Sequence, residues 1–246
     1  MKNEPRRENG ITVRYLSQTI INDVSIFNLS GIDLFVESLT NHHNVSKKNF
    51  NNLNFYFFLH LEDYGIDDKS EIDFILWNEK VILPVEVKAF TDANSPDVKK
   101  EIIRNFLHIN DLKKNSMFHF NDKQQIYPIL LYSESYQDWK RGVNSDTDYF
   151  NKNFLLTKGK DQSHQLDNWD KGGYPIPSKY YSKPEFMNNI KTINKNLFFT
   201  TWENIYKIHV RLDNSGIFTK RIEELENLKD SEQDKKGINL IKNAGS

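Results

Sequence analysis

The sequence of 246 residues contains no cysteine, which excludes disulfides, thiolate metal sites and a cysteine nucleophile. It also lacks any apolar run of the ~18 or more residues that a membrane-spanning helix needs. The first residues, "MKNEPRRENG", are polar and have no apolar segment of the kind found in secretory signals. We therefore expect a cytoplasmic protein that does not associate with a membrane.

An excess of charge of one sign is missing as well. The 33 Lys and Arg residues nearly balance the 34 Asp and Glu residues, for a net charge of −1. Proteins that coat nucleic acid without selectivity usually have a clearly basic balance, so this class is not expected. Charge segregated onto one face could still bind nucleic acid. The seven histidines form no ligand-spaced set, and "KGGYPIP" lacks the strand and helix that surround a phosphate-binding loop.

Hydrophobic periodicity predicts an alternation of helices and strands. A helix is expected from Ser30, and a second from Ser95, where Ser95 is a good N-cap and Pro96 suits the first helical position. Strands are expected at 53–61, 71–77, 81–90, 126–132 and 196–202, and a last helix around 218–228. This order predicts an α/β fold in which helices flank a mixed central β-sheet.

The chain divides by composition. Residues 133–195 are rich in Ser, Asp, Asn, Gly, Lys and Tyr and show little periodicity, over a length that is unusual for a structureless loop. We therefore predict an irregular insertion there. The predicted organisation is an N-terminal extension (1–29), a core (30–132) that resumes after the insertion (196–229), and a polar tail (230–246).

Charged residues interrupt the apolar stretch "SEIDFILWNEKVILPVEVKAF", which begins at Ser70. Alternation along a strand places Glu86 and Lys88 on one face and Val85 and Val87 on the other. A hairpin turn near 78–80 would bring Asp73 and Glu86 towards one end of the sheet. Buried charge is costly unless it is paired or bound to a metal, so this pattern indicates a site.

Two neighbouring carboxylates repel each other unless a positive charge lies between them. Oxygen ligands suit Mg²⁺, or Mn²⁺ in its place, so Asp73 and Glu86 are candidate metal ligands and the carbonyl of Val87 could add another. Lys88 could orient or deprotonate a water, or stabilise the charge of a phosphate in the transition state. These groups are those that phosphodiester hydrolysis requires.

Asp73 in "SEIDFIL", followed after 12 residues by Glu86 and Lys88 in "VEVK", resembles the PD-(D/E)XK nuclease superfamily. The similarity extends over roughly 30–132 and 196–212. It implies an αβββαβ restriction-endonuclease-like core, with Glu37 of the first helix completing the catalytic set. Size and the insertion favour a sequence-specific, type II restriction-like DNA endonuclease. The chain departs from the family pattern at Ile72, which replaces its proline, and at Pro84, which predicts a bulge or an unpaired side in the second motif strand.

Several alternatives remain open from the sequence. An RNA-cleaving toxin nuclease would use the same site with a different groove, and a catalytically inactive nucleic-acid-binding module would keep only the fold. The charged residues could also form cross-strand pairs on a solvated hairpin. Glu37 lies away from the apolar stripe of its helix and could simply face solvent.

Candidate nucleic-acid contacts lie in two segments. Lys99, Lys100 and Arg104 are in the first turns of the helix after the motif, where the helix N-terminus would help them bind phosphate. The insertion contributes basic residues interleaved with aromatic rings that could stack on bases, and Arg141 suits a guanine edge. The remaining candidates of the insertion are Lys140, Lys171 and Lys179. The competing interpretations are an ordinary solvated helix face for the first segment and a polar subdomain or homodimer contact for the insertion.

Overall fold

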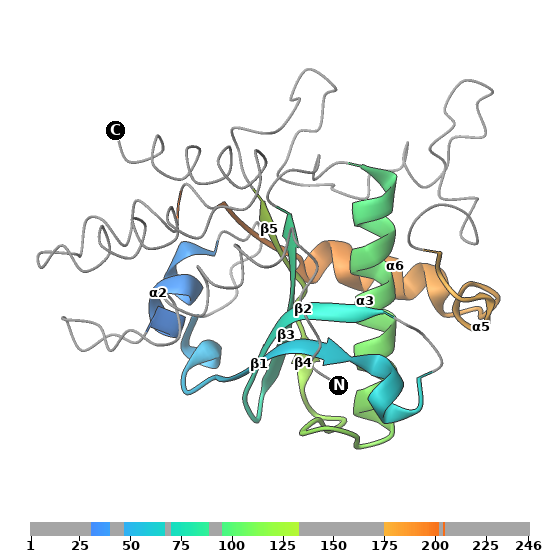
Figure 1. Ribbon diagram of the computed structural model, residues 1–246, viewed down its shortest axis with the longest axis horizontal. Coiled ribbons are helices and arrows are strands. Elements are labelled where there is room, and N and C mark those ends of the chain that lie inside the picture. The colour runs from blue at the N-terminus through green and yellow to red at the C-terminus, as the bar shows by residue number, and fades with distance from the viewer. Residues whose placement is uncertain are drawn as a thin grey trace, which may run out of the picture.

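The structure is a computed structural model, and it describes residues 31–39, 47–66, 70–88, 95–132, 175–201 and 204. Helices alternate with the strands of one sheet (Figure 1). The α-helices are α2 (Gly31–Ser38), α3 (Pro96–Lys114), α5 (Ser178–Tyr181) and α6 (Phe186–Asn196), with 3-10 turns η2 (Lys47–Phe50) and η3 (Leu61–Tyr64). The strands are β1 (Asn54–His60), β2 (Glu71–Trp77), β3 (Val81–Lys88), β4 (Gln125–Ile126), β5 (Ile129–Tyr132) and β6 (Phe198–Thr201).

The sheet is mixed, with strand order β1-β2-β3-β5-β6 and the short β4 beside β3. β1, β2 and β3 form an antiparallel meander, whereas β5 runs parallel to β3 and β6 runs parallel to β5. Helix α3 connects β3 to its parallel neighbours, as a parallel pairing requires a crossover. The predicted α/β class, with a mixed sheet flanked by helices, is therefore confirmed.

Pro84 of β3 lies opposite Pro128, which is between β4 and β5, at a break in the pairing of β3. β3 pairs with β4 at Val81↔Gln125 and with β5 from Val85↔Ile129, and both pairs are 44 residues apart in sequence (125 − 81 and 129 − 85). The same register places Pro84 opposite Pro128, where neither residue has an N–H to donate. The other side of β3 pairs with β2 without interruption, including Ile75↔Pro84. The expected unpaired side is therefore present, but the alternative expectation of a bulge is wrong, because the register stays constant.

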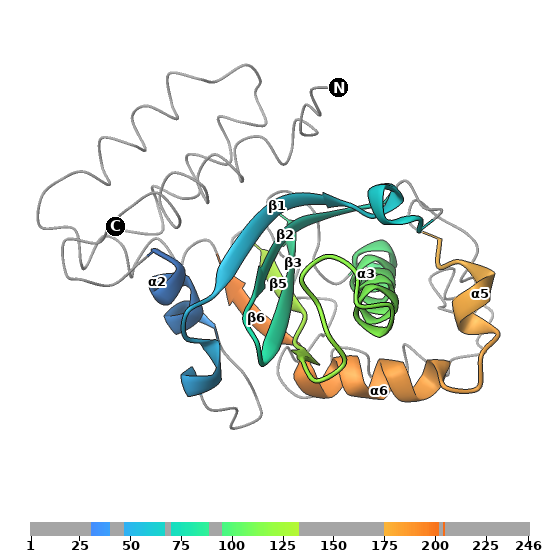
Figure 2. The ribbon, with the colours of Figure 1, turned by 90° about the horizontal axis from the view of Figure 1, so that it is seen from below.

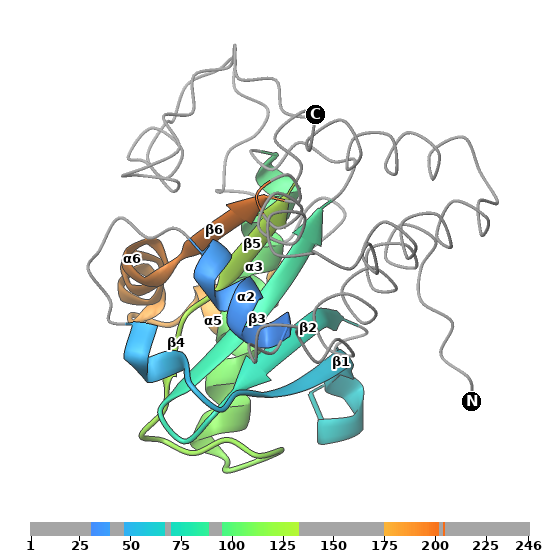
Figure 3. The ribbon, with the colours of Figure 1, turned by 90° about the vertical axis from the view of Figure 1, so that its left-hand side faces the viewer.

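Apolar residues fill both faces of the sheet. Figure 2 and Figure 3 show α2 on one face and α3, α5 and α6 on the other. On the α2 face, Phe35 packs edge-on against Phe74, with a ring-centroid distance of 6.2 Å. Val85 and Val87 of β3 belong to the same buried cluster. Their strand neighbours Glu86 and Lys88 must therefore project from the α3 face.

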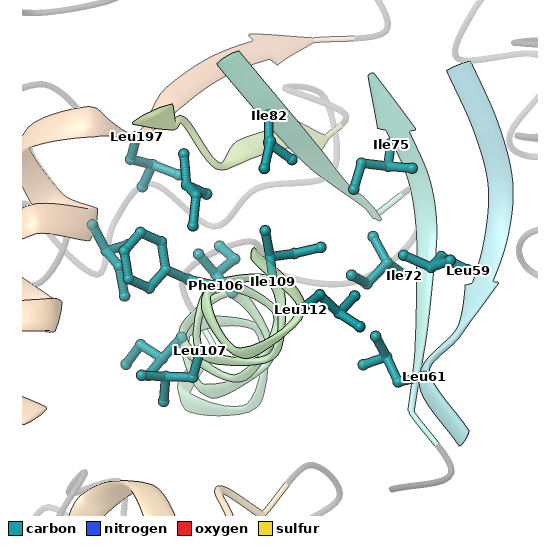
Figure 4. Packing of buried hydrophobic residues seen from close by; sticks show 14 of the residues in the cluster. Leu59, Leu61, Ile72, Ile75, Ile82, Phe106, Leu107, Ile109, Leu112 and Leu197 are labelled. Carbon is teal, nitrogen blue, oxygen red and sulfur yellow. The ribbon is translucent and has the colours of Figure 1, made fainter. Parts of the chain in front are cut away.

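Helix α3 is the centre of the larger core cluster. Figure 4 shows Ile109 and Leu112 directed towards Ile75 and Ile72 of the sheet, and Phe106 on the side nearer Leu197. The helix begins as the sequence predicts, because the Ser95 side chain accepts a hydrogen bond from the Val98 amide at 3.3 Å, with Pro96 at the first helical position. Within the described ranges, no helix combines the length and apolar character needed to cross a bilayer.

The predicted insertion is too long at its C-terminal end. The prediction includes residues 175–195, yet α5 and most of α6 lie within this range. Phe186, Ile190 and Ile193 of α6 are buried in the same cluster as α3. Their spacing of four and three residues is that of one helix face, so α6 is a core helix that the polar composition around it concealed. Residues 133–174 lie outside the described part of the chain, as do the predicted extension, tail and last helix.

Candidate active site

The antiparallel hairpin β2–β3 positions the two motif carboxylates. The register runs from Trp77↔Ile82 to Phe74↔Val85, and one further step places Asp73 opposite Glu86. Asp73 Oδ2 accepts a hydrogen bond from the Val87 amide at 2.9 Å, so the side chain continues the link between the two strands beyond the Phe74↔Val85 pair. Both carboxylates are buried, with 6% of Asp73 and 3% of Glu86 exposed. The predicted proximity of these two residues is therefore met.

Lys88 lies between two carboxylates from different elements. Its Nζ is 2.6 Å from Glu86 Oε1 and 2.8 Å from Glu101 Oε2. Glu86 is on the same strand, two residues away, whereas Glu101 comes from the second turn of α3. Charge-assisted contacts of this length are strong in a buried setting, so Lys88 ties the strand to the helix.

Asn105 holds the other oxygen of Glu86. It lies one turn after Glu101 on α3, and its Nδ2 donates a hydrogen bond to Glu86 Oε2 at 2.9 Å. Asn105 is 3% exposed, and its Oδ1 has no hydrogen-bond partner among the described residues. Each oxygen of Glu86 therefore has its own contact, to an ammonium on one side and an amide on the other.

Burial and mutual repulsion raise the pKa values of two of the carboxylic acids. Burial, reinforced by the charge of Glu86, raises the pKa of Asp73 well above its ordinary value. The same two causes raise the pKa of Glu101 to about 8, against partial compensation from Lys88 and Arg104. Burial disfavours the ammonium of Lys88, but the charges of Glu86, Glu101 and Asp73 outweigh this effect and raise its pKa. Both carboxyl shifts favour the neutral acid, so the site resists holding the negative charges of Asp73, Glu86 and Glu101 at the same time.

The chemistry of these side chains suits a hard divalent cation. Carboxylate and amide oxygens are the donors that Mg²⁺ and Mn²⁺ accept. Among the described residues, no three Asp, Glu or His side chains are arranged as a ready-made metal site. Mg²⁺ commonly uses one or two carboxylates and keeps several waters, so Asp73 and Glu86 would suffice as protein carboxylate ligands. The unpaired acceptor Asn105 Oδ1 is a further oxygen close to Glu86.

Glu101 and Asn105 are the site residues that sequence reasoning missed. Both lie on the helix that follows the motif strand, and their spacing of four residues places them on one face. His108 and Leu112 continue that face at spacings of three and four. A helix face that begins with polar residues, directly after the strand with Glu86 and Lys88, is the pattern that could have identified them.

The structure does not bring Glu37 to this site. Glu37 is exposed, on the helix that covers the opposite face of the sheet from Glu101 and Asn105 (Figure 2). The neighbouring Ser38 is buried and anchors the end of this helix, since Thr200 Oγ1 donates to Ser38 Oγ at 2.9 Å. Phe35 and Val36 of the helix face the core, which leaves Glu37 on the outer side. The expectation that Glu37 completes the set is therefore corrected, in favour of its solvent-facing alternative.

The three basic residues in the first turns of α3 are buried rather than exposed. Lys99, Lys100 and Arg104 are 3%, 4% and 6% exposed. Neither the expected phosphate contact nor the alternative of a solvated helix face agrees with that burial. Arg104 instead acts within the candidate site, where its charge lowers the pKa of Glu101.

Lys179 is exposed on α5, with its Nζ 4.9 Å from the ring centroid of Tyr180. Helix α5 lies on the same side of the sheet as Glu86 and Lys88, and α3 lies between α5 and the sheet in Figure 1 and Figure 2. The proposed contact of Lys179 with nucleic acid stays a prediction. Its predicted companions Lys140, Arg141 and Lys171 lie outside the described residues.

Comparisons with known proteins add no assignment. No protein-family model matches the chain, and no curated protein or solved structure is similar enough to count as a match.

Proposed function

We propose that the chain is a metal-dependent endonuclease of the PD-(D/E)XK type, which hydrolyses phosphodiester bonds in DNA. The observation that carries the proposal is the burial of Asp73 and Glu86 on two adjacent strands, with the Lys88 side chain, 14% exposed, in contact with Glu86. A solvated hairpin, the plainest alternative, would leave these side chains exposed. Burying them instead costs free energy that a purely structural role does not explain.

The order of the described elements also supports the proposed αβββαβ core. Helix α2 precedes the meander of three strands, α3 follows it, and β4 and β5 come next, both beside β3. The motif carboxylates lie on the second and third strands of this order, and Lys88 is the last residue of the third. The resemblance implies the same arrangement of strands and motif residues.

Each side chain has a definite task in the proposed reaction. Asp73 and Glu86 would hold Mg²⁺ or Mn²⁺, which supplies Lewis acidity and an activated water when bound. The contacts of Lys88 with two carboxylates favour its charged form, so we assign it to phosphate stabilisation and water orientation rather than to proton abstraction. The Val87 amide fixes Asp73, and Asn105 fixes Glu86.

The test is incubation of the full chain with plasmid DNA and with structured RNA, in Mg²⁺, in Mn²⁺ and in EDTA. Discrete DNA fragments that require the cation support the restriction-like proposal. Cleavage of RNA alone would replace DNA with RNA as the substrate, as in a toxin nuclease. Binding of either nucleic acid without cleavage would refute the enzyme and leave an inactive binding module. Lys88→Ala, purified in parallel, excludes a contaminating nuclease if it is inactive.

A further inference from the structure

Two of the contacts that anchor Lys88 are carboxylates, and the proposed nuclease needs one of them to bind its cation. Glu86 Oε1 lies 2.6 Å from Lys88 Nζ, and Glu101 Oε2 lies 2.8 Å from the same atom. If a divalent cation binds Glu86, the cation and the ammonium compete for this carboxylate and repel each other. A lysine with only Glu86 as its partner would then be driven from the site.

We infer that Glu101 is a positioning residue that keeps the Lys88 ammonium in the site while Glu86 binds a cation. This inference rests on the proposed function and deepens it, because it assigns a role to a residue outside the family motif. The two anchors belong to different elements, so losing the contact on β3 leaves the contact on α3 in place. Lys88 is 14% exposed at its side chain, so water offers it little alternative.

Asn105, on the same helix, holds the Glu86 side chain in place. Its Nδ2 donates to Glu86 Oε2 at 2.9 Å, on the oxygen that Lys88 does not contact. An amide is neutral, so it does not repel a cation that approaches Oε1. Asn105 therefore holds the orientation of Glu86 whether or not Lys88 remains on the other oxygen. Spacing of four residues lets α3 present Glu101 and Asn105 together to the end of β3.

A merely structural role for Glu101 makes a different prediction. If Glu101 only compensates a buried lysine, its contact with Lys88 should not depend on a cation at Glu86. The positioning role requires that Glu101 becomes essential for holding Lys88 only when Glu86 is taken. Chemical reactivity of the Lys88 amine, compared with and without a cation, separates the two.

The experiment uses competitive acetylation of the full chain, read by mass spectrometry, in EDTA and in saturating Mn²⁺. In the wild type we expect Lys88 to stay protected in both conditions. In Glu101→Gln we expect protection in EDTA, where Glu86 still holds the amine, and a rise in reactivity of roughly 5-fold or more in Mn²⁺, because the amine has then lost both of its carboxylate contacts. Glu79→Gln, the same change at the exposed β2–β3 turn, should match the wild type.

Equal protection of Lys88 in wild type and Glu101→Gln in Mn²⁺ would overturn the inference, and so would Mn²⁺-induced exposure of Lys88 in the wild type. If Glu101→Gln does not fold, Glu101→Asp replaces it, with a smaller rise of about 2-fold expected for an anchor shortened by one methylene. The readout does not depend on cleavage. A chain that cuts neither DNA nor RNA would defeat the proposed function while the acetylation pattern still decides the role of Glu101.

Where the chain does cut, kinetics give a second, independent readout. Glu101→Gln should lower kcat by roughly 10-fold or more, because Lys88 is misplaced at the reacting phosphate. Its half-saturating Mn²⁺ concentration should stay within about 3-fold of the wild type, since Glu101 is not assigned as a cation ligand. The opposite result, with an unchanged kcat and a raised half-saturating Mn²⁺ concentration, would make Glu101 a metal ligand and overturn its positioning role.

Discussion

Asp73 combines two roles that a single substitution can separate. Its Oδ2 accepts the Val87 amide, and its charge is the part that a cation would use. Asp73→Asn keeps an oxygen for the amide but removes the charge. We expect a loss of cleavage of roughly 10²-fold or more, as is typical when one electrostatic contributor to a transition state is removed.

The measurement for Asp73→Asn is the rate of plasmid or RNA cleavage in Mg²⁺, alongside circular dichroism to verify the fold. Glu79→Gln is the control for the loss of one carboxylate elsewhere. Cleavage by Asp73→Asn at the rate of the wild type would show that Asp73 is not part of the catalytic set.

A second prediction at the scale of the residue concerns how Glu101 changes the stability of the fold with pH. Burial and Glu86 raise the pKa of Glu101 from an ordinary 4.5 to about 8 in the folded chain. A raised carboxyl pKa contributes stability below the unfolded pKa, and this contribution is lost as pH rises through the folded pKa. In the absence of divalent cations, the free energy of unfolding should therefore fall between about pH 5 and pH 8.

Glu101→Gln cannot ionise, so this part of the pH dependence should disappear. We expect its stability relative to the wild type to improve by at least ~1 kcal/mol from pH 5 to pH 8, since each unit of pKa shift corresponds to ~1.4 kcal/mol. Urea unfolding in EDTA at the two pH values gives the comparison, with Glu79→Gln as the control. Parallel pH dependence in Glu101→Gln and wild type would contradict the assignment of a raised pKa.

At the scale of the element, the prediction is that α6 belongs to the hydrophobic core. Ile190 is fully buried against the α3 cluster, whereas Met187, on the same helix, is 40% exposed. Ile190→Ala should lower the free energy of unfolding by ~2–5 kcal/mol through lost burial and a residual cavity. Met187→Ala should change it by less than about 0.5 kcal/mol.

Urea unfolding monitored by tryptophan fluorescence and by circular dichroism measures both variants. A small effect of Ile190→Ala, similar to that of Met187→Ala, would mean that α6 does not pack in the common core. The insertion would then extend to residue 195, as the sequence predicts.

At the scale of the whole molecule, a cation that binds only the folded chain must stabilise it. With Mn²⁺ at a hundred times its dissociation constant, the gain is ~2.7 kcal/mol. For a chain of this size this corresponds to a rise in Tm of roughly 5–10 °C. Asp73→Asn, which removes one proposed ligand charge, should lose most of the rise.

Differential scanning calorimetry of wild type and Asp73→Asn, in EDTA and across a Mn²⁺ titration, measures this prediction. NaCl at the same ionic strength controls for nonspecific ionic effects on Tm. An equal rise in Asp73→Asn would place the cation elsewhere in the molecule.

The near-neutral balance of 33 basic and 34 acidic residues makes individual cations important for binding nucleic acid. If Arg141 reads a base, Arg141→Ala should cost ~1–3 kcal/mol and relax specificity at one position. If Lys140 contacts a phosphate, Lys140→Ala should weaken binding to all sequences and reduce the salt slope by about 1. Lys80→Ala, at the exposed β2–β3 turn, is the control.

Binding isotherms at several salt concentrations, on matched and altered sequences, check both expectations. Equal losses of affinity on every sequence for Arg141→Ala would make it a phosphate contact rather than a base contact. No loss for either variant would remove residues 133–174 from the recognition surface.

Local pattern in the sequence determined the elements and the motif. Alternation of apolar residues predicted β2 over Glu71–Trp77, the Ser95–Pro96 pair predicted the start of α3, and the "EID…VEVK" spacing brought Asp73, Glu86 and Lys88 together. These features depend on the period of a strand or on hydrogen bonds between near neighbours, so the residues themselves carry the information.

Only the tertiary structure decided which distant groups meet. Glu101 and Asn105 reach the end of β3 because the α3 crossover lies against that face of the sheet, and Glu37 is excluded because α2 covers the other. The membership of α6 in the core was decided in the same way, by packing against α3. Helix periodicity says which residues share a face, but not which surface the face will cover, because that choice depends on how the connections place whole elements against the sheet.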